Sequence, residues 1–209
     1  MDIASKLAQY LLEIKAVKLQ PNAPFTWSSG WKSPIYCDNR ITLSNPEIRS
    51  FIAKAMGDRI KTEFPNADAL CGVATAGIAV GALAAHELNL PYAYCRPKPK
   101  EHGMKNQLEG ELNPKAKIVV VEDLISTGGS SLKVVDYLRN EGFNVVGMAS
   151  IFTYGFDVAS ENFREANCPV FSLTSYMEML PLAQASGYIN QDALPTLESW
   201  RADPANWNQ

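Results

Sequence analysis

The chain has 209 residues, of which 46% are hydrophobic and 20% are charged, and its formal net charge is −3. This composition is typical of a folded globular domain and argues against intrinsic disorder. The negative net charge argues against a general nucleic-acid-binding protein, for which a basic surface is expected.

The first predicted element is an amphipathic helix over residues 3–14, with Asp2 as its cap. A segment rich in Pro, Ser and aromatic residues follows over residues 21–43, where short strands at most are expected. The sequence Ser-Asn-Pro at residues 44–46 predicts the start of a second helix, because a capping residue followed by proline favours a first helical turn. This helix is expected to end at Phe64, before a proline.

Strands and helices then alternate along the chain. Residues 96–115 are expected to form a long polar loop, and the residues after 175 to be helical with interruptions at prolines 181, 195 and 204. Buried apolar strands that alternate with helices predict an α/β domain with a mostly parallel central sheet. The predicted strands are 69–73, 92–95, 117–121, 145–152 and 169–173, and the predicted helices between them are 77–88 and 130–141.

Cysteine spacing and hydropathy indicate whether the chain is expected in the cytoplasm, outside the cell or in a membrane. The cysteines at 37, 71, 95 and 168 form no C-x-x-C pair, so neither a zinc knuckle nor a disulfide framework is predicted. No secretion signal is recognised, and a reducing cytoplasm is expected. The longest uncharged run, residues 69–85, is shorter than the ~20 apolar residues of a membrane span and predicts a buried strand, a turn and a helix.

The strongest chemical signal is the sequence KIVVVEDLISTGGSS, residues 117–131. A strand of β-branched residues ends in Glu122 and Asp123, and residues 126–130 then lead into a helix. In an open α/β sheet, ligands bind outside the carboxyl ends of the strands. Glycines let backbone N–H groups approach an anion, and the helix N-terminus adds partial positive charge. The segment therefore predicts a phosphate site beside two acids that suit a vicinal diol or a cation next to one.

Ordinary turn chemistry is the competing interpretation of this segment. A Gly-Gly pair before a helix is common, Ser130 can be no more than a helix cap, and two acids at a strand end can simply be solvated. For the Gly-Gly pair alone the structural interpretation is favoured, whereas for the whole string, acids included, a functional role is favoured. The string is neither a Walker motif nor a G-x-G-x-x-G motif.

The combination resembles the phosphoribosyl diphosphate (PRPP) signature of type I phosphoribosyltransferases. The resemblance implies that Glu122 and Asp123 hold the ribose 2- and 3-hydroxyls and are catalytic, because carboxylates stabilise the positive charge that develops when diphosphate leaves C1. Mg²⁺ is the implied cofactor; it neutralises the departing diphosphate and is bound mainly through PRPP, without direct protein ligands. The implied PRPP-binding residues of this segment are Glu122, Asp123, Leu124, Ile125, Ser126, Thr127, Gly128, Gly129 and Ser130.

Two further segments resemble the diphosphate-binding parts of orotate phosphoribosyltransferases. The sequence GVATAGIAVG, residues 72–81, is similar to the loop that places backbone amides on the diphosphate. The sequence RPKPKEHG, residues 96–103, is similar to the mobile catalytic loop. By this resemblance Arg96, Lys100 and His102 bind the diphosphate, and Lys100 is catalytic because it stabilises the leaving group. Taken alone, such a basic run would be a solvated surface loop.

The base that accepts the phosphoribosyl group is indicated by residues 25–38, FTWSSGWKSPIYCD. This segment resembles the one that covers the orotate pocket in the same family. The implied orotate-binding residues are Ser126 and Lys32. The Arg that many members place after the next strand, to meet the orotate carboxylate, corresponds to Tyr154 here. The partner of that carboxylate therefore stays open between Lys32, Arg40 and backbone amides.

The resemblance also implies an architecture and an assembly. The expected architecture is the type I phosphoribosyltransferase fold, a mostly parallel sheet flanked by helices with a small N-terminal hood. Residues 1–209 are expected to form one domain, with a helix and hood over about 1–43, an α/β core over 44–175 and a helical segment over 176–209. A cytoplasmic homodimer with shared active sites is implied, and its expected reaction makes orotidine 5′-phosphate from orotate and PRPP in de novo UMP synthesis.

Two other functions are alternatives to this reaction. A purine phosphoribosyltransferase on the same fold would keep residues 118–131 but would have no use for residues 25–38. A PRPP-sensing regulator could bind RNA or DNA through the basic loop at residues 96–105, but the net negative charge and the lack of a longer basic stripe argue against it. Orotate and PRPP are therefore the expected partners, and neither nucleic acid nor a membrane is expected.

Overall fold

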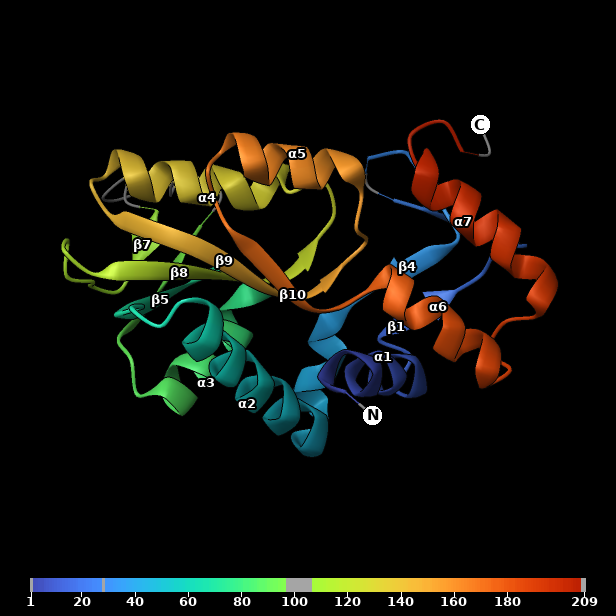
Figure 1. The fold of residues 1–209 in the computed structure, drawn as a ribbon, viewed down its shortest axis with the longest axis horizontal. Helices are drawn as coiled ribbons and strands as arrows, with labels where there is room; N and C mark the ends of the chain where they lie inside the picture. Colours follow the sequence, from blue (N-terminus) through green and yellow to red (C-terminus); the bar gives the residue numbers. More distant parts are fainter. Residues whose placement is uncertain (1, 28, 97–106, 208–209) are drawn as a thin grey trace.

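The computed structural model describes residues 2–27, 29–96 and 107–207, and its centre is a sheet of six strands (Figure 1). The strands lie in the order β10-β9-β8-β5-β6-β7, and every neighbouring pair is parallel except β6 and β7. The prediction of a mostly parallel sheet is thus confirmed. The strands are β5 (Ala69–Val73), β6 (Tyr92–Cys95), β7 (Leu108–Glu109), β8 (Lys117–Ile125), β9 (Asn144–Thr153) and β10 (Val170–Ser175).

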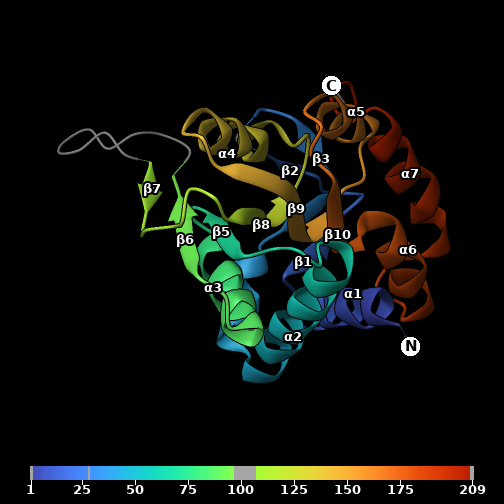
Figure 2. The same ribbon diagram turned by 60° about the vertical axis from the view of Figure 1, so that its left-hand side comes forward.

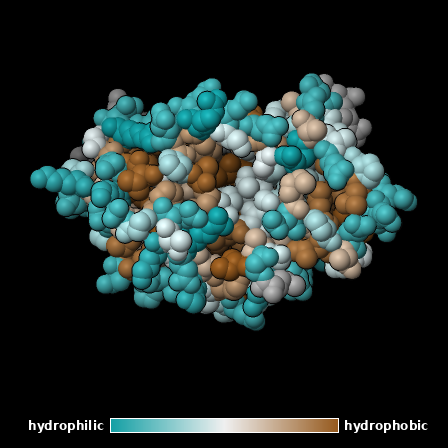
Figure 3. All heavy atoms as spheres, in the orientation of Figure 1, coloured by the Kyte–Doolittle hydropathy of each residue, from teal (hydrophilic) through white to brown (hydrophobic). Residues whose placement is uncertain are grey.

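Helices cover both faces of this sheet, with α2 and α3 on one face and α4 and α5 on the other (Figures 1 and 2). The C-terminal helices α6 and α7 lie beyond β10, where α6 contacts α1. In Figure 3, hydrophilic atoms cover the upper rim over α4 and α5, and hydrophobic atoms show below that rim. The helices are α1 (Ile3–Glu13), α2 (Pro46–Glu63), α3 (Gly77–Leu88), α4 (Gly129–Asn140), α5 (Asp157–Glu165), α6 (Tyr176–Ala185) and α7 (Leu194–Ala202), with short 3-10 turns at η1 (Asn39–Ser44) and η2 (Gln191–Ala193).

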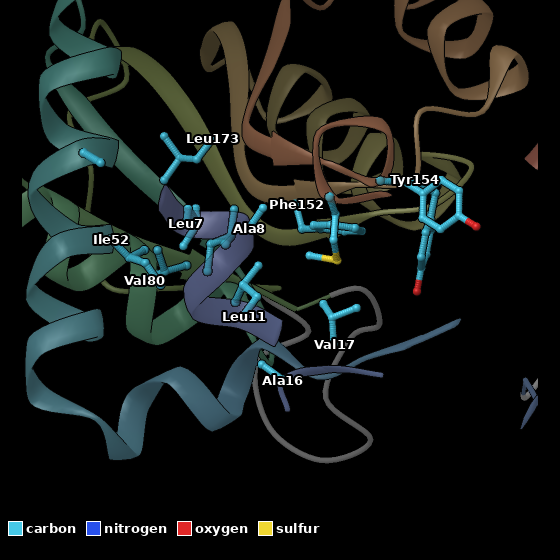
Figure 4. Close-up of a cluster of buried hydrophobic side chains, with 14 of the residues drawn as sticks. Leu7, Ala8, Leu11, Ala16, Val17, Ile52, Val80, Phe152, Tyr154 and Leu173 are labelled. Carbon is cyan, nitrogen blue, oxygen red and sulfur yellow. The ribbon is translucent and has the colours of Figure 1, made fainter. Parts of the chain in front are cut away.

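Alternate residues of β8 supply two hydrophobic cores, because successive side chains of a strand point to opposite faces. Val119 and Val121 belong to a core shared with α1, α2, α3, α6 and α7, whereas Ile118 and Val120 belong to a second core under α4 and α5. Figure 4 shows part of the first core, where Leu7 and Leu11 of α1 lie near Phe152 of β9. The N-terminal helix is thus tied directly to the sheet.

The hood consists of two antiparallel strand pairs near the N-terminus. One pair is β1 (Val17–Leu19) with β4 (Ile35–Cys37), and the other is β2 (Phe25–Thr26) with β3 (Lys32–Ser33). The prediction of only short strands in residues 21–43 is confirmed. η1 then leads from β4 into α2.

Helix starts follow the predicted caps. The Asp2 carboxylate accepts a hydrogen bond from the Ser5 backbone N–H at 2.8 Å, and the Asn45 side chain accepts one from the Ile48 N–H at 3.2 Å. Pro46 lies in the first turn of α2, where a helix has no use for its missing N–H. The predicted strand–turn–helix of residues 69–85 is formed by β5 and α3, and no helix in the described part of the chain is long and apolar enough to cross a membrane.

The structure corrects the expected elements at five points. β8 continues past residue 121 to Ile125, because β9 pairs with it as far as Ile125 opposite Thr153. The predicted loop 96–115 contains the short strand β7, and α5 was not predicted at all. Pro181 lies inside α6 instead of interrupting the helical segment. Gly128, not Ser130, occupies the cap position of α4.

Candidate active site

Two adjacent cavities open where β8 leads into α4. We name the first, of about 410 Å³, the anion cavity, and its walls are Arg40, Ala74, Thr75, Ala76, Glu122, Asp123, Leu124, Ser126, Thr127, Gly128, Ser130 and Ser131. We name the second, of about 600 Å³, the aromatic cavity, and its walls are Thr26, Trp27, Ser29, Trp31, Tyr36, Cys37, Leu124, Ser126, Thr127 and Tyr154. Leu124, Ser126 and Thr127 line both, so a ligand in one cavity can reach the other.

The loop of the anion cavity depends on one glycine. Gly128 has a φ of +79°, in the left-handed region that glycine adopts at low cost. A Cβ added at this position would lie 2.7 Å from Cε2 of Phe163 in α5, so the ring also closes off the space behind the loop. α4 begins directly afterwards, and no side chain among the described residues caps it. Its first backbone N–H groups are therefore available to an anion.

A second helix N-terminus meets the same cavity. Residues 74–76 line the cavity and lead into α3, which also has no side-chain cap among the described residues. Gly77, the first residue of α3, packs so closely on β8 that a Cβ there would lie 2.6 Å from the Val121 carbonyl oxygen. Two helix N-termini thus face one polar cavity, and each contributes partial positive charge.

The acid pair lies within β8, at the floor of the anion cavity. Glu122 is only 7% exposed; its Oε1 accepts from the Asp123 backbone N–H and its Oε2 from the Ser131 hydroxyl, both at 3.0 Å. Burial raises the pKa of Glu122 well above its usual range, and the neighbouring Asp123 charge raises it further. Burial also raises the pKa of Asp123, against opposing hydrogen bonds. The pair therefore keeps a proton to higher pH than isolated carboxylates do.

Arg40 supplies a cation to the anion cavity. Its guanidinium donates two hydrogen bonds to Asp38, at 2.6 Å and 2.8 Å, and these bonds raise the pKa of Arg40. In the sequence, Arg40 is one of the candidate partners of the orotate carboxylate. The side chain lines the anion cavity and not the aromatic cavity.

The aromatic cavity is a slot between the hood, the end of β8 and Tyr154, which follows β9. Trp27 lies 5.0 Å from the Tyr154 ring, stacks on Trp31 at 6.4 Å and meets Trp200 of α7 edge-on at 5.7 Å. The Trp27 indole N–H donates to the Ile35 carbonyl at 3.2 Å, which fixes the ring to β4. Flat apolar walls with hydroxyls at the rim suit a planar heterocycle.

The structure separates the two residues that were predicted to contact orotate. Ser126 lies on the wall that the two cavities share. Lys32 is exposed and does not line the aromatic cavity; its Nζ donates to the Thr26 hydroxyl at 2.9 Å. Tyr154, 3% exposed, does line that cavity, and none of its described lining residues carries a positive charge.

The remaining predicted residues fall in three places. Leu124, Ser126, Thr127, Gly128 and Ser130 line the anion cavity, whereas Ile125 is buried in the second core and Gly129 opens α4. Lys100 and His102 lie outside the described residues. Arg96 is described: its backbone N–H donates to the Gln107 carbonyl at 2.9 Å, and its Nε lies 3.9 Å from Glu109 Oε1.

Three polar side chains that hold the site were not singled out from the sequence. The Asn39 amide donates to the Asp123 carbonyl at 2.9 Å, the Asn162 amide donates to the Thr127 carbonyl at 2.9 Å, and Ser131 binds Glu122. Only Ser131 carried a signal, because it directly follows the predicted phosphate loop. The two asparagines are far away in the sequence and are brought to the loop by folding.

Residues 41–175 match the phosphoribosyl transferase domain family. The chain is 54% identical to an orotate phosphoribosyltransferase of Phocaeicola vulgatus, covering 96% of this chain and 94% of that one, and 51% identical to one of Cytophaga hutchinsonii, covering all of both. Among solved structures, it is similar to the orotate phosphoribosyltransferase of Aeropyrum pernix, with a TM-score of 0.76 and 28% identity over 88% of this chain and 99% of the other. With these relatives and this pair of cavities, the chain belongs to the orotate phosphoribosyltransferase family.

Proposed function

We propose that the protein transfers the 5-phosphoribosyl group of PRPP to orotate, giving orotidine 5′-phosphate and diphosphate in pyrimidine biosynthesis. The observation that carries this proposal is the wall of Leu124, Ser126 and Thr127 that the anion cavity and the aromatic cavity share. PRPP in the anion cavity directs its C1 toward that wall, and a planar base in the aromatic cavity meets it there. Holding two reactants at such a junction lowers the entropic barrier to their reaction.

PRPP is positioned by backbone and carboxylate groups. The 5-phosphate lies at the start of α4, against residues 126–130, and the diphosphate lies toward residues 74–76 at the start of α3. Glu122 and Asp123 accept hydrogen bonds from the ribose 2- and 3-hydroxyls. As diphosphate leaves and positive charge develops on the ribose, the carboxylates stabilise that charge. Orotate N1 attacks C1 directly as the C1–O bond to diphosphate breaks, and the N1 proton passes to the departing diphosphate, so no side chain acts as a nucleophile.

Mg²⁺ is the proposed cofactor, carried mainly by oxygens of PRPP. It supplies charge neutralisation for the departing diphosphate. Glu122 and Asp123 provide the negative surroundings that such a cation needs. Within the described ranges, no group of three or more His, Cys, Asp or Glu side chains gathers as a metal site.

The loop and the assembly complete the proposal. Arg96, Lys100 and His102 are proposed to bind the diphosphate, with Lys100 stabilising the leaving group. A cytoplasmic homodimer, in which the loop of one subunit serves the site of the other, is proposed from the family resemblance alone. Both points are testable by activity of mixed dimers that carry a loop variant in one subunit and an acid-pair variant in the other.

The test of the reaction is a substrate comparison. Purified protein with PRPP and Mg²⁺ is supplied in turn with orotate, adenine, hypoxanthine and xanthine, and diphosphate release is measured together with the nucleotide formed. Orotidine 5′-phosphate is expected from orotate, with no turnover of the purines. Turnover of a purine without turnover of orotate would replace the proposal by a purine phosphoribosyltransferase, and salt-dependent RNA binding without any turnover would replace it by a regulator.

A further inference from the structure

The acid pair lies on the part of β8 that pairs with β9 but no longer with β5. β5 pairs with β8 only as far as Gly72 opposite Val121, whereas β9 continues to Ile125 opposite Thr153. Beyond Val121, one edge of β8 therefore opens toward the anion cavity. An unpaired strand edge leaves backbone N–H and C=O groups that need other partners.

Side chains take the place of the missing strand at Asp123. Its backbone N–H donates to Glu122 Oε1 at 3.0 Å, and its carbonyl accepts from the Asn39 amide at 2.9 Å. The first of these bonds is local, since Glu122 is the preceding residue. The second comes from η1, at the end of the hood, and is a hydrogen bond from the hood segment to the backbone of the acid pair.

Both polar atoms of the Asn39 side-chain amide form hydrogen bonds. Asn39 is 2% exposed, and its Oδ1 accepts from the Cys37 thiol at 3.4 Å while its Nδ2 donates to Asp123. Its own carbonyl accepts from the Thr42 hydroxyl at 2.6 Å, which holds the turn of η1. Cys37 lines the aromatic cavity, so the amide connects a wall of one cavity to the floor of the other.

We propose that Asn39 is a positioning residue that fixes the Asp123 backbone against the hood, so that the ribose on the acid pair and the base in the aromatic cavity stay aligned. This inference rests on the proposed function. The chemistry requires an amide, because Asp123 offers an acceptor and Cys37 offers a donor. A carboxylate here would face the Asp123 carbonyl with a second acceptor, and an apolar side chain would leave that carbonyl without its partner.

The test uses Asn39→Ala and Asn39→Asp, with Asn45→Asp as the matched control. Asn45 lies in the same segment, but its side chain acts as an acceptor at the start of α2, a role that Asp fills equally well. A shift of about 1 Å at a reacting group can cost roughly a hundredfold in rate. We expect kcat to fall at least about tenfold in both Asn39 variants, KM for PRPP to change less than about threefold, and the control to resemble the wild type.

A pH profile separates positioning from general loss of structure. In Asn39→Asp the introduced carboxyl regains a donor when it is protonated, so its kcat relative to the wild type is expected to rise as pH falls. The charged and titratable groups around it are Cys37, Asp38, Arg40, Arg49, Glu122 and Asp123, and all of them are also present in Asn39→Ala. Asn39→Ala is therefore expected to show no such relative recovery.

Amide hydrogen exchange over residues 121–125 gives a readout that needs no turnover. Exchange is expected to be faster in Asn39→Ala than in the wild type, and unchanged in Asn45→Asp. Unchanged exchange and unchanged kcat in Asn39→Ala would overturn the positioning role. A wild type that makes no orotidine 5′-phosphate would instead overturn the proposed reaction, while the exchange data would still decide whether Asn39 holds the end of β8. If Asn39→Ala fails to fold, Cys37→Ala serves as a second variant, because it removes only the hydrogen bond to the Asn39 Oδ1. It is expected to lower kcat by less than Asn39→Asp does. An unchanged kcat in Cys37→Ala would contradict the positioning role of Asn39.

Discussion

The two cavities of the site are built in different ways. The anion cavity takes most of its walls from one continuous stretch, residues 122–131, where a strand, a loop and a helix follow each other. The aromatic cavity takes its walls from the hood, from the end of β8 and from Tyr154 after β9, and it is backed by Trp200 of α7. Local backbone geometry therefore determines the first cavity, and long-range packing determines the second.

This difference predicts how each cavity responds to substitution. In the anion cavity, one changed residue alters a charge or a backbone angle that nothing else can replace. In the aromatic cavity, several rings share the contact with the base, and loss of one is partly compensated by the others. Effects on PRPP and on catalysis should thus be large, and effects on orotate should be smaller and confined to its KM.

The largest effect is expected for Asp123→Asn. Loss of one preorganised charge at the ribose is expected to lower kcat by roughly a hundredfold or more. Because burial raises the pKa of this carboxyl, the native state holds its proton more tightly than the unfolded chain does. The free energy of unfolding therefore falls as pH rises from the unfolded pKa, about 4, through the raised native pKa.

The variant should flatten that part of the pH–stability curve while it abolishes most activity. Once the pH exceeds the raised native pKa, its free energy of unfolding is expected to equal or exceed that of the wild type by up to about 2 kcal/mol. Urea unfolding between about pH 4 and about pH 8 measures this, with kcat determined on the same preparations. A variant that is both inactive and less stable at neutral pH would show that the charge is needed for folding rather than for the reaction.

The next effect is expected for Gly128→Ala, compared with Gly142→Ala. Both glycines have positive φ, +79° and +88°, but an added Cβ meets Phe163 at Gly128 and only open space at Gly142. Each change is expected to cost about 1 kcal/mol of stability through the backbone angle, and Gly128→Ala to cost more because the ring must move. KM for PRPP should rise about tenfold in Gly128→Ala and stay unchanged in Gly142→Ala; equal KM values would mean that the Phe163 contact does not shape the loop.

The same difference explains what could be predicted from the sequence. Residues 126–130 were recognisable because a phosphate loop needs glycines and hydroxyls in consecutive positions. The end of β8 was placed too early because two acids usually mark the end of a buried strand, and only the pairing with β9 shows that it continues. α5 was missed because it is short and mostly polar, and only Ala159 and Phe163 of its residues are buried.

The aromatic cavity was predictable only in part. Trp27 and Trp31 belong to the segment that resembled an orotate-pocket cover, but nothing local indicates that Trp200 packs against them. Lys32 shows the same limit: the segment was identified, whereas the face of β3 that carries its side chain depends on pairing with β2. Which side chains of a short hairpin face a cavity is decided by tertiary contacts.

A smaller effect is expected for Trp27→Leu. The ring contacts Tyr154, Trp31 and Trp200, and its N–H bonds to the hood. Loss of this surface is expected to raise KM for orotate about tenfold, because one aromatic contact contributes on the order of 1 kcal/mol beyond its buried area. KM for PRPP should change little in the same assays. A parallel rise in both KM values would show that the two cavities are not independent.

The smallest effect is expected for Tyr154→Phe, which removes one oxygen and keeps the packed ring. The Tyr154 hydroxyl has no hydrogen-bond partner among the described residues and belongs to a side chain that lines the aromatic cavity, at the edge of the core in Figure 4. Burial raises the pKa of this hydroxyl well above its usual range, so it stays protonated and can donate to an acidic base. Loss of one such bond, about 1 kcal/mol, is expected to raise KM for orotate roughly fivefold at any pH between about 7 and 9. Tyr188→Phe, at a distant surface position whose hydroxyl donates to the Val17 carbonyl at 3.4 Å, is the control. An unchanged KM in Tyr154→Phe would leave recognition of the base to the shared wall at Ser126 and to the stacked rings.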